Sequence, residues 1–418
     1  MYTKIKRCRL CGNDQIEPII HLGMQFLTGV FPIRKDAGVT CGPIELVKCR
    51  EDKKGQHCGL VQMRHSYDRR EMYGSNYGYR SGLNQSMVDH LNSKVSDILK
   101  PVKLEKGDII LDIGSNDGTL LKSYRHKDVE LVGFDPTGEK FKKFYSSRIK
   151  LITNFFSAEI FKKIFGQKKA KIITSIAMFY DIENPLDFLR EIHSILHKEG
   201  VWLLEQSYMP MMIQKNAYDT ICHEHLEYYR LKQIDWMTRH TGLKIIDVNF
   251  NQVNGGSFSI MICRNDASLR PADILVRQIL KEEYKQAFHE MSPYKAFAQR
   301  VAEHKIFLWD TIAQLRKKKA EVFGYGASTK GNVILQWCGF SKKELPVIAD
   351  VNPDKFGHLT PGTWIPIVSE DYAKKERPDY FLVLPWHFRQ NFLFRERKFL
   401  KRGGKMIFPL PEIEMVGV

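Results

Sequence analysis

The segment Asp219-Thr-Ile-Cys-His-Glu-His-Leu-Glu-Tyr-Tyr229 holds the residues best suited to proton chemistry. It places Glu224 between His223 and His225. A histidine beside a carboxylate can remove a carbon-bound proton near pH 7, because the base must be largely unprotonated and still basic. The same residues also suit a polar helix start or a pair of metal ligands, and the segment alone leaves these alternatives open.

A glycine-rich loop, Leu111-Asp-Ile-Gly-Ser-Asn-Asp-Gly-Thr119, follows a predicted strand and opens a helix. Glycines let the backbone approach a ligand closely at the tip of a strand. The next predicted strand ends at Asp135, where a carboxylate can accept hydrogen bonds from both hydroxyls of a ribose. The pattern resembles class I S-adenosylmethionine-dependent methyltransferases; a ligand-free turn and an NAD enzyme are the alternatives. It predicts cofactor contacts at Asp112, Gly114, Asn116, Gly118 and Asp135.

Five of the eight cysteines lie within the first 58 residues. Cys8-Arg-Leu-Cys11 is a zinc knuckle, since thiolates two residues apart can grip one tetrahedral ion. Cys49 and Cys58 are the predicted second pair despite their wider spacing, and His57 or Cys41 can replace one of them. Such clustering favours metal over disulfides. Four ligands leave no open position, so the predicted zinc is structural; free thiols and catalytic zinc are the alternatives.

A second loop, Gly324-Tyr-Gly-Ala-Ser-Thr-Lys330, also joins a predicted strand to a helix. Its backbone N–H groups, Ser328 and Lys330 can hold a pyrophosphate. It lacks the third glycine of a dinucleotide site and the spacing of a Walker loop, which disfavours NAD and ATP. A vestigial turn is the alternative. Trp386 and His387 follow a later strand and are predicted to border the cleft, although aromatic packing explains them equally well.

Alternating elements must position these loops. From residue 108 onward, apolar strand-like runs alternate with amphipathic helical ones, which predicts a doubly wound α/β sheet. Runs at 245–248 and 258–262 predict a terminal hairpin. A charged helical region over 284–319 breaks at Ser292-Pro293, and a second strand–helix alternation follows it. We therefore expect an α/β protein of three domains.

The composition excludes some classes of protein. The 418-residue chain is 43% hydrophobic and carries a formal net charge of +16. Its N-terminus lacks a secretory apolar run, and no stretch approaches the roughly 18 apolar residues of a membrane span. We expect a cytoplasmic protein with no membrane contact. The lysines are spread out, which favours a solvated basic surface, with attraction of a diphosphate substrate as the second explanation.

Further motifs follow in one order: Glu205-Gln-Ser-Tyr-Met-Pro210, Asn254-Gly-Gly-Ser257, Asp350-x-Asn-Pro-x-Lys-x-Gly357, Pro361-Gly-Thr363 and Leu384-Pro-Trp-His387. With the motifs above, they resemble the sugar C-methyltransferases that act on nucleotide-linked 4-keto-hexoses. The resemblance covers nearly the whole chain. It implies a zinc-binding domain (1–74), an S-adenosylmethionine-binding methyltransferase domain (75–265) and a Rossmann-like nucleotide-sugar-binding domain (266–418). The active site is then expected between the last two.

The resemblance also implies catalytic roles. His225 is the implied base, with Glu224 beside it. Tyr77 or Tyr79, in a Tyr-x-Tyr-x-Ser motif that ends at Ser81, is expected to hydrogen-bond the developing enolate oxygen, as Glu224 also can. Placed donors of this kind are worth several kcal/mol in the transition state.

Three other positions complete the expected site. Ser81 and Ala177 join the predicted cofactor contacts, and Asn254 joins the substrate-binding residues. Asp181 and Cys222 stand where some relatives carry His and Tyr, so auxiliary acid–base roles at these two positions are in doubt.

We therefore expect an S-adenosylmethionine-dependent enzyme that methylates carbon 3 of a nucleotide-diphosphate 4-keto-deoxyhexose through an enolate. The expected partner is this small molecule, carried on dTDP or GDP, with no nucleic acid beyond the nucleotide, and the expected state is a monomer. An RNA methyltransferase with a zinc knuckle is one alternative, although no groove-like run of basic and aromatic residues stands out. A non-catalytic protein on an inherited fold is the other.

Overall fold

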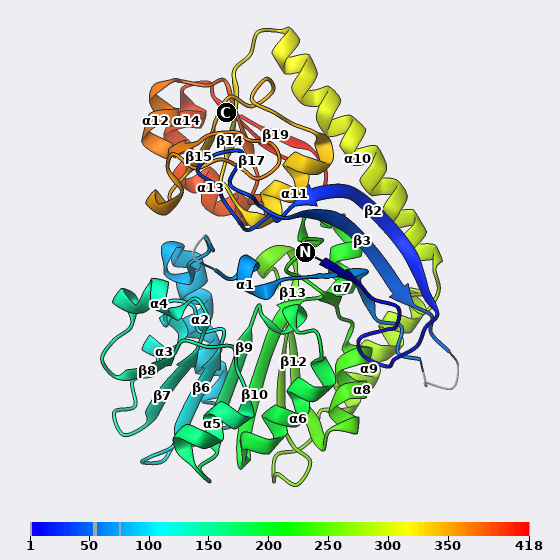
Figure 1. Cartoon of the computed structure of the whole chain (residues 1–418), viewed down its shortest axis with the longest axis vertical. Coiled ribbons are helices and arrows are strands. Elements are labelled where there is room, and N and C mark those ends of the chain that lie inside the picture. The colour runs from blue at the N-terminus through cyan, green and yellow to red at the C-terminus, as the bar shows by residue number, and fades with distance from the viewer. Residues whose placement is uncertain (1, 53–56, 75–76, 418) are drawn as a thin grey trace.

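The computed structural model describes residues 2–52, 57–74 and 77–417. Two α/β lobes face each other, and an N-terminal β-structure runs along one side of both (Figure 1). Among the described residues, no helix combines the length and apolar character needed to cross a bilayer.

The N-terminal part forms an antiparallel sheet in the order β11-β4-β3-β2. Its strands are β2 (Ile16–Phe26), β3 (Cys41–Cys49), β4 (Val61–Met63) and β11 (Glu227–Tyr228). A separate pair joins β1 (Tyr2–Lys4) to β5 (His65–Tyr67), and the short helix α1 (Arg69–Met72) follows. The pairing of β11 with β4 links the His-Glu-His segment directly to the cysteine-bearing sheet.

The first lobe is a seven-stranded sheet in the order β12-β13-β10-β9-β6-β7-β8. Its strands are β6 (Ile109–Ile113), β7 (Glu130–Phe134), β8 (Ile149–Ile152), β9 (Ala170–Ile176), β10 (Leu196–Ser207), β12 (Leu243–Asn251) and β13 (Ser257–Arg264). β13 runs antiparallel to both of its neighbours, β10 and β12, so the predicted hairpin of β12 and β13 forms the edge of the sheet.

Alternate residues of these strands face opposite helical layers, as the two-residue period of a strand requires. Ile110 packs with the layer that contains α2, while Leu111 packs with the layer that contains α5, α6 and α8. The helices of this lobe are α2 (Gln85–Ile98), α3 (Thr119–Lys122), α4 (Gly138–Phe141), α5 (Ala158–Phe165), α6 (Pro185–Ile195), α7 (Met209–Gln214) and α8 (Leu231–His240). The doubly wound sheet predicted from the sequence is thereby confirmed.

The second lobe is a six-stranded sheet in the order β16-β15-β14-β17-β18-β19, the strand order of a Rossmann fold. Its strands are β14 (Val322–Tyr325), β15 (Ile348–Asp350), β16 (Ile367–Ser369), β17 (Tyr380–Val383), β18 (Lys405–Phe408) and β19 (Glu414–Val416). Its helices are α11 (Thr329–Cys338), α12 (Glu370–Lys375), α13 (Arg389–Arg395) and α14 (Arg397–Lys401).

Two helices connect the lobes: α9 (Asp273–Lys285) and α10 (Ser292–Lys317). The long helix begins at Ser292 with Pro293 in its first turn, where the missing proline N–H costs nothing, as the break and restart predicted there require. Figure 1 shows α10 running beside β2 and β3. The predicted domain boundaries stay predictions, since β11 crosses from one range into another, and residues 75 and 76, beside the first boundary, lie outside the described residues.

Candidate functional site

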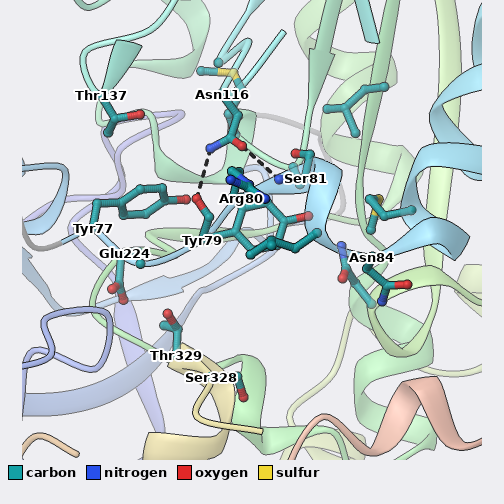
Figure 2. A pocket seen from close by; sticks show the side chains of 18 of the residues that line it. Tyr77, Tyr79, Arg80, Ser81, Asn84, Asn116, Thr137, Glu224, Ser328 and Thr329 are labelled. Atoms are coloured by element: carbon teal, nitrogen blue, oxygen red, sulfur yellow. Dashed lines mark hydrogen bonds between the residues drawn. The ribbon is translucent and has the colours of Figure 1, made fainter. Parts of the chain in front are cut away.

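A cavity of about 640 Å³ lies between the two lobes, where their parallel strands end. Figure 2 shows Asn116 and Thr137 of the first lobe on one side, Ser328 and Thr329 of the second on the other, and Tyr77 and Tyr79 between them. Most of the residues predicted for the site line this cavity: Tyr77, Tyr79, Ser81, Asp112, Gly114, Asn116, Asp135, Ala177, Glu224, His225, Asn254, Ser328, Lys330 and His387.

Two predicted contacts lie outside the lining. Gly118 caps α3 with a φ of 72°, and a side chain there would approach the ring of Tyr145, so the glycine serves the turn. Trp386 is buried, donates its indole N–H to Asp219 Oδ2 at 2.8 Å and packs beneath Gly255. It therefore supports the cavity wall from behind.

His225 is held in one tautomer by the backbone. Its Nδ1 lies 2.8 Å from the carbonyl oxygen of Thr220, and a carbonyl can only accept, so Nδ1 carries the hydrogen. In the neutral ring this leaves Nε2 as a proton acceptor. Burial and the charge of Lys330 lower the pKa of His225 to about 3, so the ring is neutral near pH 7.

The side chain of Glu224 is more deeply buried than that of His225. Its Oε2 accepts a hydrogen bond from Thr28 Oγ1 at 3.2 Å, while Oε1 has no partner among the described residues. Oε1 also fills the space that a side chain at Gly29 would need. Burial raises the pKa of Glu224, which favours a protonated carboxyl that can donate a hydrogen bond.

The first glycine loop brings its backbone against Asp135. The N–H of Asn116 donates to Asp135 Oδ2 at 2.7 Å, and Thr137 donates to Oδ1 through both its N–H and its hydroxyl. Oδ1 thus already accepts two hydrogen bonds, whereas Oδ2 accepts one and keeps acceptor capacity for a ribose hydroxyl. Gly114, with a φ of 77°, keeps the loop tight, and Asp112 lies buried below it. These residues fit the ribose and the cationic sulfonium of S-adenosylmethionine.

The side chain of Asn116 turns away from the loop. Its Oδ1 accepts from the N–H of Ser81 at 2.9 Å, and its Nδ2 donates to the carbonyl of Tyr79 at 3.2 Å (Figure 2). The predicted cofactor contact at Asn116 therefore includes a second task, the anchoring of the Tyr-x-Tyr-x-Ser motif. Burial and the nearby Asp135 raise the pKa of Tyr77, so its hydroxyl stays a donor.

Ala177 takes an unusual backbone conformation for a residue with a side chain, with a φ of 53°. Its N–H donates to the carbonyl of Glu205 at 2.8 Å. Local strain of this kind persists where the surroundings hold it, and it gathers at functional sites. Ala177 thereby brings the chain after β9 to the cavity wall.

The second glycine loop is basic. Ser328 caps α11 by accepting from the N–H of Gly331 at 3.0 Å. Lys330 donates to the carbonyl of Asn254 at 2.9 Å, so it joins the loop to the edge of the first lobe. Burial and the charge of Lys330 lower the pKa of His387, which lines the same end of the cavity in its neutral form.

Several residues that line the cavity are not among those predicted from the sequence. Asp350 is the last residue of β15, and Asp135 directly follows β7, so the rule that located Asp135 could have found Asp350. The Nζ of Lys355 lies 3.9 Å from Asp350 Oδ2 and donates a hydrogen bond to the carbonyl of Ala327 at 2.6 Å. Glu205, quoted only as part of a motif, is buried at the cavity wall.

Glu205 is part of a buried charge network. Its Oε1 lies 2.5 Å from His90 Nε2 and its Oε2 lies 2.8 Å from Lys94 Nζ, and these contacts offset the negative charge of the carboxylate. Both partners come from α2, whose amphipathic pattern carries no signal for such a contact.

Asp181 and Cys222, the two positions that depart from some relatives, differ in whether they line the cavity. Asp181 lines the cavity and accepts from the hydroxyl of Tyr73 at 2.6 Å. Cys222 is fully buried and outside the lining. His223 is also fully buried, and its ring lies edge-on to that of Tyr67 at 4.5 Å between centroids.

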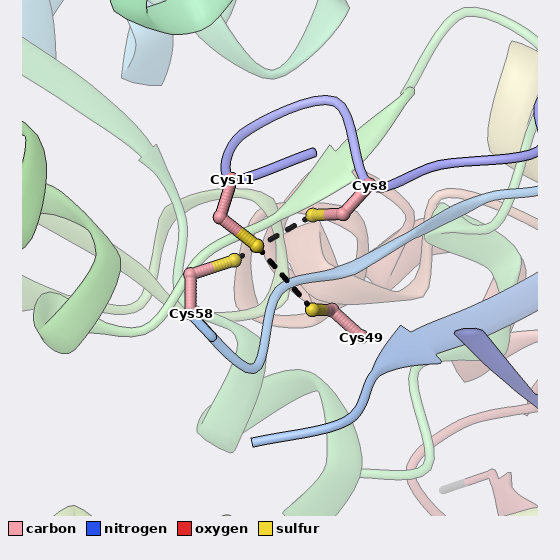
Figure 3. A group of neighbouring side chains, drawn as sticks. All are labelled: Cys8, Cys11, Cys49 and Cys58. Carbon is pink, nitrogen blue, oxygen red and sulfur yellow. Dashed lines mark hydrogen bonds between the residues drawn. The ribbon is translucent and has the colours of Figure 1, made fainter. Parts of the chain in front are cut away.

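The four cysteines predicted as ligands come together: the Sγ atoms of Cys8, Cys11, Cys49 and Cys58 all lie within 4.8 Å of one another (Figure 3). The Cys8–Cys58 and Cys11–Cys49 sulfurs are 3.5 and 3.6 Å apart. Four thiolates on one zinc, at Zn–S distances of about 2.3 Å, would be about 3.8 Å apart. The group therefore fits a zinc ion, and neither alternative ligand, Cys41 or His57, belongs to it.

Comparison with protein-family models agrees with this architecture. Residues 8–73 match a zinc binding domain, residues 87–248 match a methyltransferase domain, and residues 252–411 match a C-methyltransferase C-terminal domain. A curated relative, C-methyltransferase NovU from Streptomyces niveus, is 29% identical over 417 residues, which is 99% of this chain and 97% of the relative.

Other similarities are partial. A tRNA U34 carboxymethyltransferase from Campylobacter lari is 28% identical over 122 residues, 27% of this chain and 40% of that protein. The crystal structure of a Burkholderia thailandensis 1,6-didemethyltoxoflavin-N1-methyltransferase has a TM-score of 0.32 at 8% identity, covering 43% of this chain and 78% of that one. Neither similarity extends across both lobes and the cysteine-bearing sheet.

The fold and the site define a class I, S-adenosylmethionine-dependent methyltransferase with an N-terminal zinc-binding cysteine cluster. The full-length similarity to a C-methyltransferase and the match of the second lobe specify the type of transfer. Together these findings support an S-adenosylmethionine-dependent C-methyltransferase.

Proposed function

We propose that this enzyme methylates carbon 3 of a nucleotide-diphosphate 4-keto-deoxyhexose, with His225 as the base. One observation carries the proposal: the Thr220 carbonyl holds His225 in the tautomer that leaves Nε2 free to accept a proton, and the ring lines the cavity between the two loops. A C-methyltransferase needs such a group, because a carbon nucleophile must first lose a proton.

The ketone at carbon 4 makes the neighbouring proton acidic, since the resulting charge is delocalised onto oxygen. His225 Nε2 takes this proton, and Tyr77 donates to the enolate oxygen, as Glu224 also can when its carboxyl is protonated. Burial is the main cause of the lowered pKa of His225 and the charge of Lys330 is the second; an anionic diphosphate beside Lys330 would offset the second cause and so make the ring a stronger base. S-adenosylmethionine, held at Asp135 and the first loop, supplies an electrophilic methyl group.

The second loop supports a nucleotide diphosphate as the handle of the sugar. Backbone N–H groups at the start of α11, together with Ser328 and Lys330, suit a pyrophosphate. We further propose that the zinc is structural, since four sulfurs leave no open position, and that the enzyme acts as a cytoplasmic monomer.

Labelled S-adenosylmethionine tests the substrate class. We expect label to enter dTDP- or GDP-linked 4-keto-deoxyhexoses and not the matching 4-hydroxy sugars, because only the ketone acidifies the carbon. Bulk RNA serves as the competing acceptor. Label in RNA, or in the 4-hydroxy sugars as readily as in the keto sugars, would contradict the proposal.

The variant His225→Asn tests the base. We expect methyl transfer to fall about 100-fold or more while S-adenosylhomocysteine affinity is kept, since the ring acts on the acceptor. His126→Asn, on the exposed surface, is the matched control and should behave as the wild type. Near-normal turnover in His225→Asn would remove His225 as the base.

A further inference from the structure

Residues Tyr77–Ser81, which we call the bridging segment, are held by side chains from both lobes. The segment lines the middle of the cavity, between the first and the second glycine loop (Figure 2). Its backbone also pairs with Val30 of the N-terminal part through Tyr77. All three parts of the molecule therefore meet at five consecutive residues.

The first lobe holds the segment through Asn116. This side chain binds the carbonyl of Tyr79 and the N–H of Ser81, while its own backbone N–H donates to Asp135. The neighbouring Asp117 accepts from the N–H of Gly82, directly after the segment, at 2.9 Å. The residue that contacts the predicted ribose acid thus also fixes the bridging segment.

The second lobe holds the same segment through Asn352. Its Nδ2 donates to the carbonyl of Gly78 at 3.2 Å, and its Oδ1 accepts from the N–H of Asp354 at 3.1 Å. Gly78 fits a narrow slot: a Cβ there would come within 2.8 Å of Lys355 and 3.2 Å of the Phe31 ring. Lys355 also donates to the carbonyl of Ala327 in the second glycine loop. A shift of that loop would therefore move the Lys355 side chain that lies beside Gly78.

We propose that the bridging segment couples donor binding to the second lobe, and that Asn352 is a positioning residue for the methyl donor although it lies on the opposite lobe. Asn352 fixes the carbonyl of Gly78, and this limits the positions that Tyr79 and Ser81 can take. Asn116 binds these two residues, so its backbone N–H is fixed against Asp135. Coupling of this kind is reciprocal, so donor binding also orders the second lobe. The inference does not depend on which acceptor is used.

The variant Asn352→Ser isolates this contact. Serine can still cap the N–H of Asp354, but it is too short to reach the carbonyl of Gly78. We expect S-adenosylhomocysteine affinity, measured by isothermal titration calorimetry, to fall about 5-fold or more with an unchanged melting temperature. Gln390→Ser, at an exposed residue of the same lobe that does not line the cavity, is the control and should bind the ligand as the wild type does.

A double-mutant cycle separates coupling from general loosening. Asn116→Gly keeps the left-handed backbone (φ of 50° at Asn116) and the N–H to Asp135, but removes both contacts to the segment. In that background we expect Asn352→Ser to change donor affinity by less than about 2-fold. Additive effects, or wild-type affinity in Asn352→Ser alone, would overturn the proposal. Failure of methyl transfer to keto sugars would leave these binding results intact.

Discussion

In the first lobe, Asp135 follows β7 and accepts from the loop N–H of Asn116 at 2.7 Å; in the second lobe, Asp350 ends β15 and accepts from the loop N–H of Ala327 at the same distance. Each acid also accepts from the N–H two residues further on, again at 2.7 Å. The two sheets therefore build their glycine loops on one backbone design.

The charges around the two loops differ. Near Asp135 the additional partner is the neutral hydroxyl of Thr137, whereas Asp350 has the ammonium group of Lys355 nearby and Lys330 within the loop. The same backbone thus suits ligands of opposite charge: a cationic sulfonium on the first lobe and, as we propose, an anionic diphosphate on the second. Strand order and glycines fix where a ligand lies, and the few side chains beside them select which ligand it is.

Removing the acid of the first loop should give the largest effect. Asp135→Ala is expected to weaken S-adenosylhomocysteine binding about 100-fold, because the carboxylate no longer accepts a hydrogen bond from the ribose and no longer holds the loop N–H of Asn116. The acceptor KM, measured at saturating donor, should change little. A loss smaller than about 3-fold would show that the donor does not lie against this acid.

Removing a cation from the second loop should produce the opposite pattern. Lys330→Met is expected to raise the acceptor KM about 10-fold and to leave donor affinity unchanged, since only the diphosphate loses an ionic partner. Lys330→Arg keeps the charge and should recover most of the loss. Equal weakening of donor and acceptor in Lys330→Met would contradict the division of charge between the lobes.

The cysteine cluster should affect stability rather than either loop. Cys49→Ser is expected to abolish stoichiometric zinc in the purified protein, measured by atomic absorption, and to lower the melting temperature by several degrees. Cys263→Ser, at a cysteine outside the cluster, is the control for loss of a buried thiol. Full zinc occupancy in Cys49→Ser would show that the metal, if present, lies elsewhere.

The smallest effect concerns pH. Burial raises the pKa of Asp112 from its usual 3.8 to about 7. Below about pH 4 the carboxyl is protonated in both states; as pH rises toward 7, only the unfolded chain gives up the proton, so the folded state loses stability. We expect the free energy of unfolding of the wild type to fall relative to Asp112→Asn over this range, by on the order of 1–3 kcal/mol. Urea unfolding of both proteins at several pH values measures this difference. A difference in the free energy of unfolding that stays constant with pH would contradict the raised pKa of Asp112.

Much of this arrangement follows from the sequence because the signals are local. Apolar strands ending in glycine loops predict both sheets, and the carboxyl ends of parallel strands meet at one edge. The rule that an acid ends the second strand located Asp135. The same rule applied to the second sheet would have located Asp350, whose partners repeat the pattern.

The remaining contacts depend on pairings between distant residues. No local pattern indicates that the side chain of Asn116 turns toward Tyr79, or that β11 joins the cysteine-bearing sheet. Trp386 was predicted to border the cleft, but its indole N–H donates to Asp219 and the ring packs behind the wall of the cavity. These choices are made by tertiary packing, which overrides the preference of a short segment.

The central claim is that His225 removes a proton from carbon. Incubation of a 4-keto-deoxyhexose nucleotide in D2O, with enzyme and S-adenosylhomocysteine, tests it without methyl transfer. We predict that the wild type places deuterium at carbon 3, detected by NMR, and that His225→Asn does so about 100-fold more slowly or less. Deuterium entry at equal rates in both enzymes, or at another carbon, would contradict the account.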